Sequence, residues 1–282
     1  MKRLSTVRKF TLWWFSKPMV PWVSVNISVD FSCAQSYLKR LSGVSVHHLI
    51  AASIAHGLQK VPQANANIIG GQIFRRKSVH MGMPVNLLGH EGGQTRELSL
   101  MLIKHLDKKS LLDIAQEGRT TLKSERQGTP KNPFISMMFR LAENLPRQAV
   151  FKTLSAMDVL LQQPKFAERL YDVFPVTTAL SNPGSTLPSD VDGILFRGAS
   201  INLPLRLLHV GTFWGMSTIQ KEVIPIDNVP TVRPMLPITL VFDHRLIDGV
   251  KASELLLSVC KCIQEPASIF GKDGRLPPAI SV

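Results

Sequence analysis

One histidine near the C-terminus has the residue type and the setting that acid–base chemistry needs. His244 follows the apolar run LPITLVF, which is typical of a buried strand, and the residues after it lead into a helical pattern. An imidazole has an unperturbed pKa of about 6.5, so it can take up and return a proton around neutral pH. His244 could therefore act as a general base. The alternative is an ordinary surface turn, in which the charged residues Asp243, Arg245 and Asp248 only fix the loop.

The segment around this histidine resembles a known signature. FDHRLIDG is similar to the DHRxxDG motif of the dihydrolipoyl acyltransferase components of 2-oxo-acid dehydrogenase complexes, which is related to the HHxxxDG motif of chloramphenicol acetyltransferase. Asp243 stands where the acetyltransferase form has its first histidine, which favours the dehydrogenase-complex branch. Further stretches resemble the same catalytic domain in the same order: VPWVSVNISVDFSCAQSYLK, PQANANIIGGQIFRRKSVHMGMPV, DKKSLLDIA, ALSNPG and SINLPLRLLHVGTF.

The resemblance implies three site residues. His244 would deprotonate an acceptor thiol or hydroxyl, which then attacks the thioester of an acyl-CoA. Ser181 of ALSNPG would donate its hydroxyl to the oxyanion that forms, and one such donor can be worth about 3–4 kcal/mol. Asp248, the second acid of the motif, would hold the catalytic loop by an ion pair, with Arg8 as a candidate partner. Taken alone, ALSNPG is an ordinary turn, since Ser, Asn, Pro and Gly all favour turns.

The resemblance also implies the fold and the assembly. We expect an α/β fold, a two-layer chloramphenicol-acetyltransferase-like sandwich with a mixed sheet, formed by one catalytic domain over residues 1–282. We expect no lipoyl or partner-binding domain and no covalently attached lipoyl group in this chain. A homotrimer would bring His244 of one subunit to Ser181 of its neighbour.

Residue patterns along the chain predict a mixed series of strands and helices, which is consistent with the expected α/β fold. Alternation over 22–30 predicts a strand, Gly70-Gly71 predicts a two-residue hairpin, and Ser110 is expected to begin a helix. The other predicted helices cover 32–41, 44–61 and 248–263, and the other predicted strands cover 79–85, 97–106, 173–182, 194–203, 206–215 and 236–243.

Residues 127–172 fall outside the resemblance. Four prolines divide this stretch into Met- and Phe-rich helical pieces, which predicts a helical insertion. Its apolar residues could belong to the core, or they could form an amphipathic surface that meets a membrane or an acyl chain.

The amino-acid composition limits the kinds of molecule that this protein is expected to bind. The formal net charge of +13 suits polyanions such as the phosphates of coenzyme A, but the basic residues are scattered, so we expect no nucleic acid partner. The three cysteines form no CxxC pair, and the remaining histidines have no partner at metal-ligand spacing, so we expect no metal and a cytoplasmic location. No stretch approaches the roughly 18 apolar residues that span a bilayer.

The predicted reaction is acyl transfer between coenzyme A and an acceptor. The acceptor would be a dihydrolipoyl-type thiol or another small or carrier-bound group, supplied in trans by a lipoyl or acyl-carrier protein. Two alternatives stay open: a non-catalytic trimeric scaffold, and a membrane-surface acyltransferase with a lipid-like acceptor, prompted by the insertion and the positive charge.

Overall fold

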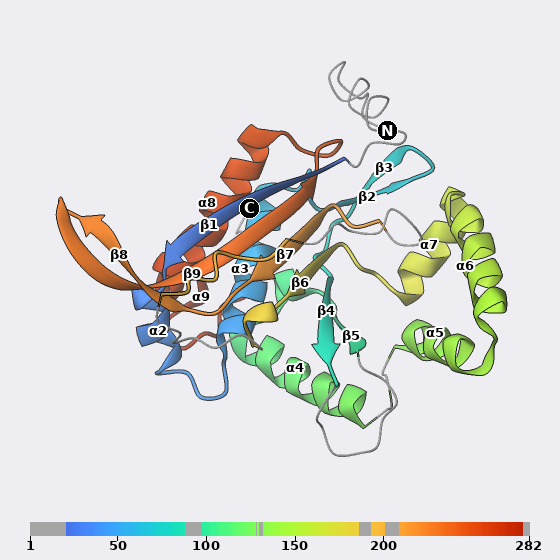
Figure 1. The fold of residues 1–282 in the computed structure, drawn as a ribbon, viewed down its shortest axis with the longest axis horizontal. Helices are drawn as coiled ribbons and strands as arrows, with labels where there is room; N and C mark the ends of the chain where they lie inside the picture. The colour runs from blue at the N-terminus through green and yellow to red at the C-terminus, as the bar shows by residue number, and fades with distance from the viewer. Residues whose placement is uncertain are drawn as a thin grey trace.

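A mixed seven-stranded sheet forms the centre of the molecule (Figure 1). The computed structural model describes residues 21–87, 98–127, 129, 132–185, 193–200 and 209–278. The strand order is β1-β9-β7-β6-β4-β5, and β8 extends the sheet along β9. The strands are β1 (Trp22–Asp30), β4 (Met81–Asn86), β5 (Leu98–Ile103), β6 (Thr178–Ser181), β7 (Thr212–Met216), β8 (Gln220–Ile226) and β9 (Val229–Asp243). Only β4, β6 and β7 run parallel to one another, so the predicted mixed sheet is confirmed.

Two long helices cover one face of this sheet and form the second layer. α3 (Val46–Lys60) packs against α8 (Gly249–Gln264), and both bury continuous apolar faces. Gly57 allows their close approach, because a Cβ atom there would lie 2.9 Å from Leu255 and 3.0 Å from Val259. Beside them lie α2 (Ser32–Leu38), α4 (Leu111–Arg126), α9 (Pro266–Phe270) and the short turn η1 (Leu106–Lys108).

Three helices at one side of the molecule lie within the stretch predicted to be an insertion, and they run slightly past its end. They are α5 (Pro133–Asn144), α6 (Arg147–Leu161) and α7 (Pro164–Val173). Proline begins α5 and α7, where its missing N–H costs no hydrogen bond. Phe151 and Val159 of α6 are 61% and 70% exposed, so part of the apolar surface of this group faces solvent.

The two-residue hairpin predicted at Gly70-Gly71 joins β2 (Ala66–Ile69) to β3 (Gln72–Arg75). A second hairpin, between β8 and β9, was not predicted. It turns at Asp227 and Asn228, whose φ angles are 49° and 62°, the left-handed values that a type I′ turn requires. Two residues that tolerate this conformation between alternating apolar positions were the signal that could have identified it.

One predicted strand is wrong over the part that the structure describes. Residues 194–200 form no strand, and 201–208 lie outside the described residues. The N–H of Phe196 donates to the side chain of Gln220 at 2.7 Å rather than to a neighbouring strand, and Gly198 has a φ of +130°. Side-chain bonding and this backbone conformation keep the segment irregular where it lies against β9.

Candidate active site

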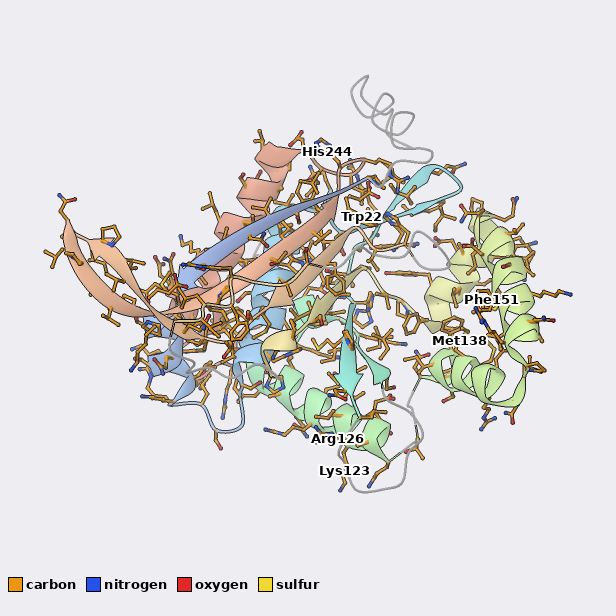
Figure 2. The ribbon with its side chains drawn as sticks, in the orientation of Figure 1. Trp22, Lys123, Arg126, Met138, Phe151 and His244 are labelled. Atoms are coloured by element: carbon orange, nitrogen blue, oxygen red, sulfur yellow. The ribbon has the colours of Figure 1, made fainter. Side chains whose placement is uncertain are left out.

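The backbone of His244 is fixed at the end of the longest strand. Its N–H donates to the carbonyl oxygen of Pro21 at 2.9 Å, directly beyond the last register pair of β1 and β9, Trp22 with Asp243. Figure 2 shows His244 and Trp22 at the same end of the β1–β9 pair. The imidazole is half-buried, so it is both held and reachable. The prediction that the strand ends at this histidine is confirmed.

Asp243, next to this histidine, is completely buried and accepts several hydrogen bonds. Arg245 donates from NH2 to Oδ2 at 2.6 Å and from Nε to Oδ1 at 3.0 Å, and its backbone N–H reaches Oδ1 at 2.8 Å. Burial opposes the ionisation of Asp243, but the bonds from His209 and Arg245 outweigh it and hold the pKa of the carboxyl below its ordinary value. The DHR segment is therefore folded around a buried carboxylate.

His209 completes the set of groups around that carboxylate. Its Nε2 lies 2.8 Å from Asp243 Oδ2, and its ring stacks on Trp22 with centroids 5.8 Å apart. No pattern in the sequence pairs His209 with Asp243, because the two residues are 34 positions apart in the chain and only the β7–β9 pairing brings them together.

Asp248 lies at the N-cap of α8. Its side chain accepts from the N–H of Lys251 at 3.0 Å, which is the usual way an aspartate satisfies the first turn of a helix. The proposed partner Arg8 lies outside the described residues. The loop-holding role predicted for Asp248 stays a prediction, and the helix cap is one contact that its side chain makes.

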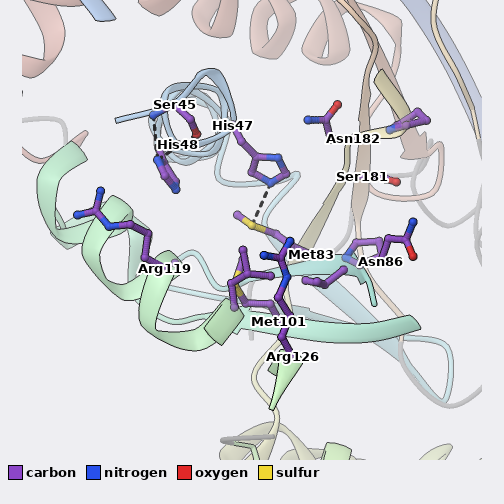
Figure 3. Close-up of a pocket in the computed structure, with 15 residues that line it drawn as sticks. Ser45, His47, His48, Met83, Asn86, Met101, Arg119, Arg126, Ser181 and Asn182 are labelled. Carbon is purple, nitrogen blue, oxygen red and sulfur yellow. Dashed lines mark hydrogen bonds between the residues drawn. The ribbon is translucent and has the colours of Figure 1, made fainter. Parts of the chain in front are cut away.

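Ser181 lies in a pocket of about 620 Å³, together with the turn that follows it (Figure 3). The SNPG turn packs tightly, since a Cβ atom on Gly184 would lie 2.2 Å from the backbone of Ser217. Apolar side chains from β4, β5 and α4 form the floor, and Arg119 and Arg126 of α4 add positive charge. Among the residues that the structure describes, those that line the pocket include no carboxylate. They are Ser45, His47, His48, Met83, Pro84, Val85, Asn86, Met101, Gly118, Arg119, Leu122, Arg126, Ser181, Asn182 and Pro183.

Two histidines of the same pocket were treated only as helix residues in the sequence. His47 Nε2 lies 3.2 Å from the Met83 sulfur, and burial followed by the charge of His48 lowers its pKa to about 4. The Nδ1 atom of His48 accepts from the N–H of Ser45 and caps α3, and burial followed by Arg119 lowers its pKa to about 4. Both rings are therefore neutral at neutral pH and offer hydrogen bonds rather than charge.

Ser181 and His244 lie far apart within one chain. Ser181 pairs with Gly215 of β7, and Gly215 pairs with Thr239 of β9. From position 239 to position 244, β9 and its end extend roughly 16 Å at about 3.3 Å per residue, and β6 is two strand spacings of about 4.8 Å away from β9. A separation on the order of 20 Å prevents these two groups from acting on one carbonyl within a single chain.

The amino-acid sequence matches a known protein family over more than half of its length. The model of the 2-oxoacid dehydrogenases acyltransferase catalytic domain matches residues 16–133 and 211–271. The chain belongs to this family. The predicted family is thus confirmed, and with it the membership in a family of acyltransferase enzymes.

Individual relatives agree with this assignment. The chain is 25% identical over 229 residues to the dihydrolipoyllysine-residue acetyltransferase component of the acetoin cleaving system of Bacillus subtilis, covering 80% of this chain and 43% of that protein. It therefore spans less than half the length of that relative. The fold is similar to the dihydrolipoamide acetyltransferase of Azotobacter vinelandii (TM-score 0.60, 18% identity, 95% and 93% of the two chains). It is also similar to a chloramphenicol acetyltransferase (TM-score 0.55, 14% identity, 93% and 100%), which confirms the predicted fold class.

Over the residues that the structure describes, no group of three His, Cys, Asp or Glu side chains is arranged to hold a metal ion. Within the same ranges, no helix has the length and apolar character that a membrane span needs.

Proposed function

We propose that this chain transfers acyl groups between coenzyme A and a thiol of the dihydrolipoyl type. His244 takes the proton from the acceptor thiol, and the thiolate attacks the carbonyl carbon of the acyl-CoA thioester. The resulting oxyanion accepts a hydrogen bond from the Ser181 hydroxyl. The intermediate collapses by breaking the bond to the coenzyme A sulfur, which recovers the proton from His244. The same steps in the opposite order transfer the acyl group from the acceptor thiol to coenzyme A.

The observation that carries the proposal is the setting of His244 in a chain of this family. His244 stands half-buried at the end of β9, with its backbone N–H bound to the carbonyl oxygen of Pro21 and its neighbour Asp243 buried in an ion pair. A base fixed in this way loses little freedom when an acceptor binds, which favours proton transfer.

The distance between His244 and Ser181 supports a shared site. Because one chain cannot bring them together, we propose that a homotrimer forms the active site between neighbouring subunits, one giving His244 and the other giving Ser181. This geometry also explains why a single chain carries its pocket at Ser181 and its base at the other end of the sheet.

The pocket beside Ser181 is our candidate for the acyl-CoA side of this site. Its apolar floor suits an alkyl or pantetheine chain, and Arg119 and Arg126 suit an anionic group attached to it. We propose that the acceptor comes from a lipoyl or acyl-carrier protein in trans, and that residues 1–282 act as one catalytic domain with 127–172 as an insertion. Free thiols at Cys33, Cys260 and Cys262 support a cytoplasmic location.

The test is direct. Purified chain is incubated with acetyl-CoA or longer acyl-CoAs and dihydrolipoamide, and free coenzyme A thiol and acyl-dihydrolipoamide are measured. We expect turnover in the wild type and its loss in His244→Ala, with His56→Ala as a control histidine on α3. Equal rates in the wild type and His244→Ala, or no thioester product in either, would refute the function and favour the scaffold.

A membrane-surface acyltransferase is the second candidate, because the insertion exposes apolar side chains. Met137, Phe151 and Val159 are 48%, 61% and 70% exposed on α5 and α6. Figure 2 shows Met138 on α5 and Phe151 on α6, in the group of helices at one side of the molecule. If a lipid-like acceptor is used, Phe151→Ser and Val159→Ser will reduce co-sedimentation with anionic liposomes. Sedimentation that does not change would exclude this candidate.

A further inference from the structure

We propose that His209 is a positioning residue for the catalytic loop. It holds the buried carboxylate of Asp243, which in turn fixes the backbone on the C-terminal side of His244. This inference rests on the proposed function, since it assigns His209 a task in the reaction of His244.

The hydrogen bonds of His209 define which ring nitrogen carries the proton. The backbone N–H of Ile68 donates to Nδ1 at 2.9 Å, so Nδ1 is an acceptor and carries no hydrogen. The hydrogen of the neutral ring then lies on Nε2, which is 2.8 Å from Asp243 Oδ2 and donates to it. The ring is 10% exposed, so water competes little for either bond. His209 is therefore a donor of fixed direction.

Asp243 passes this restraint to the base. One of its oxygens accepts the backbone N–H of Arg245 at 2.8 Å, on the C-terminal side of His244. On the N-terminal side, the N–H of Asp243 donates to the carbonyl of Gly211, and the N–H of His244 itself donates to Pro21. The peptide units around the imidazole are thus held from both directions. Without the bond from His209, the carboxylate could rotate about its Cα–Cβ bond and release the N–H of Arg245.

His209 is itself held from outside the loop. The side chain of Asn67 donates to the carbonyl oxygen of His209 at 2.5 Å and accepts from Arg76 Nε at 2.7 Å. Arg76 in turn binds Glu168 of α7 through two nitrogens, at 2.7 and 2.9 Å, and lies 3.7 Å from the ring centroid of Tyr171. A continuous set of polar contacts therefore leads from the helical insertion to Asp243. These contacts place His209 correctly before any substrate arrives.

Two substitutions separate the two bonds of His209. In His209→Asn the shorter side chain can still accept from Ile68 through its Oδ1 atom, but it cannot reach Asp243. In His209→Gln the longer amide can donate to Asp243 but loses the acceptor for Ile68. His56→Asn is the matched control, because His56 is also partly buried and bound to a backbone carbonyl, that of Pro278 at 2.9 Å.

We expect His209→Asn to lower kcat by about tenfold or more, the effect of one lost charge-assisted hydrogen bond, with KM for acyl-CoA unchanged. His209→Gln should keep most of kcat, and His56→Asn should match the wild type. Exchange of the Arg245 amide hydrogen should be faster in His209→Asn than in His209→Gln. Activities are given per folded protein, measured by circular dichroism.

Equal kcat in the Asn and Gln variants, whether both are kept or both are lost, would overturn the positioning role. The amide exchange of Arg245 separates this failure from failure of the proposed function. If the wild type shows no turnover that depends on His244, the function is wrong, and faster exchange in His209→Asn alone would still support the role of His209 in holding the loop.

Discussion

Substitution of Asp243 by Asn tests how strongly the catalytic loop depends on its buried charge. Asparagine keeps the shape of the side chain but removes the charge, and its amide can accept through only one oxygen. After the change, the N–H donors of Arg245 and His209 point at a neutral amide instead of a carboxylate. The side chain of Arg245 is only 14% exposed, so water replaces little of the lost interaction. Breaking a buried pair in this way costs about 3–5 kcal/mol. We take about 3 kcal/mol, because the guanidinium of Arg245 keeps some contact with water.

A loss of about 3 kcal/mol is measurable by urea unfolding. The midpoint should fall with an unchanged slope, and the melting temperature should drop by about 6–12 °C. Asp273→Asn is the matched control. Asp273 also accepts the N–H of the arginine two positions ahead, at 3.3 Å, but both side chains of that pair are exposed, so we expect almost no change. A loss for Asp243→Asn as small as that of the control would contradict this account of the loop.

The stability difference between the wild type and Asp243→Asn should also depend on pH. The pKa of Asp243 is lower in the folded chain than its ordinary value, so the carboxylate contributes stability above that ordinary value, near pH 4. This contribution is lost as the pH falls through the folded pKa. The difference in unfolding free energy between the wild type and Asp243→Asn should therefore be constant around neutral pH and shrink below about pH 4. A difference that grew on acidification would have the wrong sign.

The remaining predictions concern the pocket beside Ser181. Ser181→Ala should lower kcat by about 10²–10³-fold with little change in KM, as measured by coenzyme A release; an unchanged kcat would remove its oxyanion role. Arg126→Met should raise KM for acyl-CoA several-fold, whereas Lys123→Met, an exposed cation of α4 outside the pocket lining, should not; equal effects would indicate general surface charge. Gly184→Ala should cost about 1–3 kcal/mol in urea unfolding, because a Cβ atom would meet the Ser217 backbone; a neutral result would show that the SNPG turn can shift.

The sequence was sufficient wherever one short pattern decides the local structure. Alternation fixed the strand at Trp22–Asp30, Ser110 began α4 through a capping box, and the apolar run before Asp243 ended β9 at the DHR segment. The two-residue hairpin and the helices α5, α6 and α7 follow from glycine and proline in the same way. Each of these elements depends on residues within a few positions of one another.

The parts that were missed depend on contacts between distant segments. His209 reaches Asp243 only because β7 pairs with β9, and His47 shares a pocket with Ser181 only because the first turn of α3 meets Met83 of β4. No local sequence pattern indicates that these distant segments come into contact. Over the described residues 194–200, the predicted strand is absent because the side chain of Gln220 accepts the backbone N–H of Phe196 in place of a neighbouring strand.

We propose that His244 and Ser181 act together from neighbouring subunits. Co-expression of His244→Ala and Ser181→Ala chains, each inactive alone, would form mixed trimers. A site with both residues intact arises wherever a chain with His244 meets a neighbour with Ser181, which holds for about one quarter of the sites after random mixing. We predict recovery of roughly that fraction of wild-type turnover. Mixed trimers, verified by differential tags, that stay as inactive as the two parents would contradict the claim.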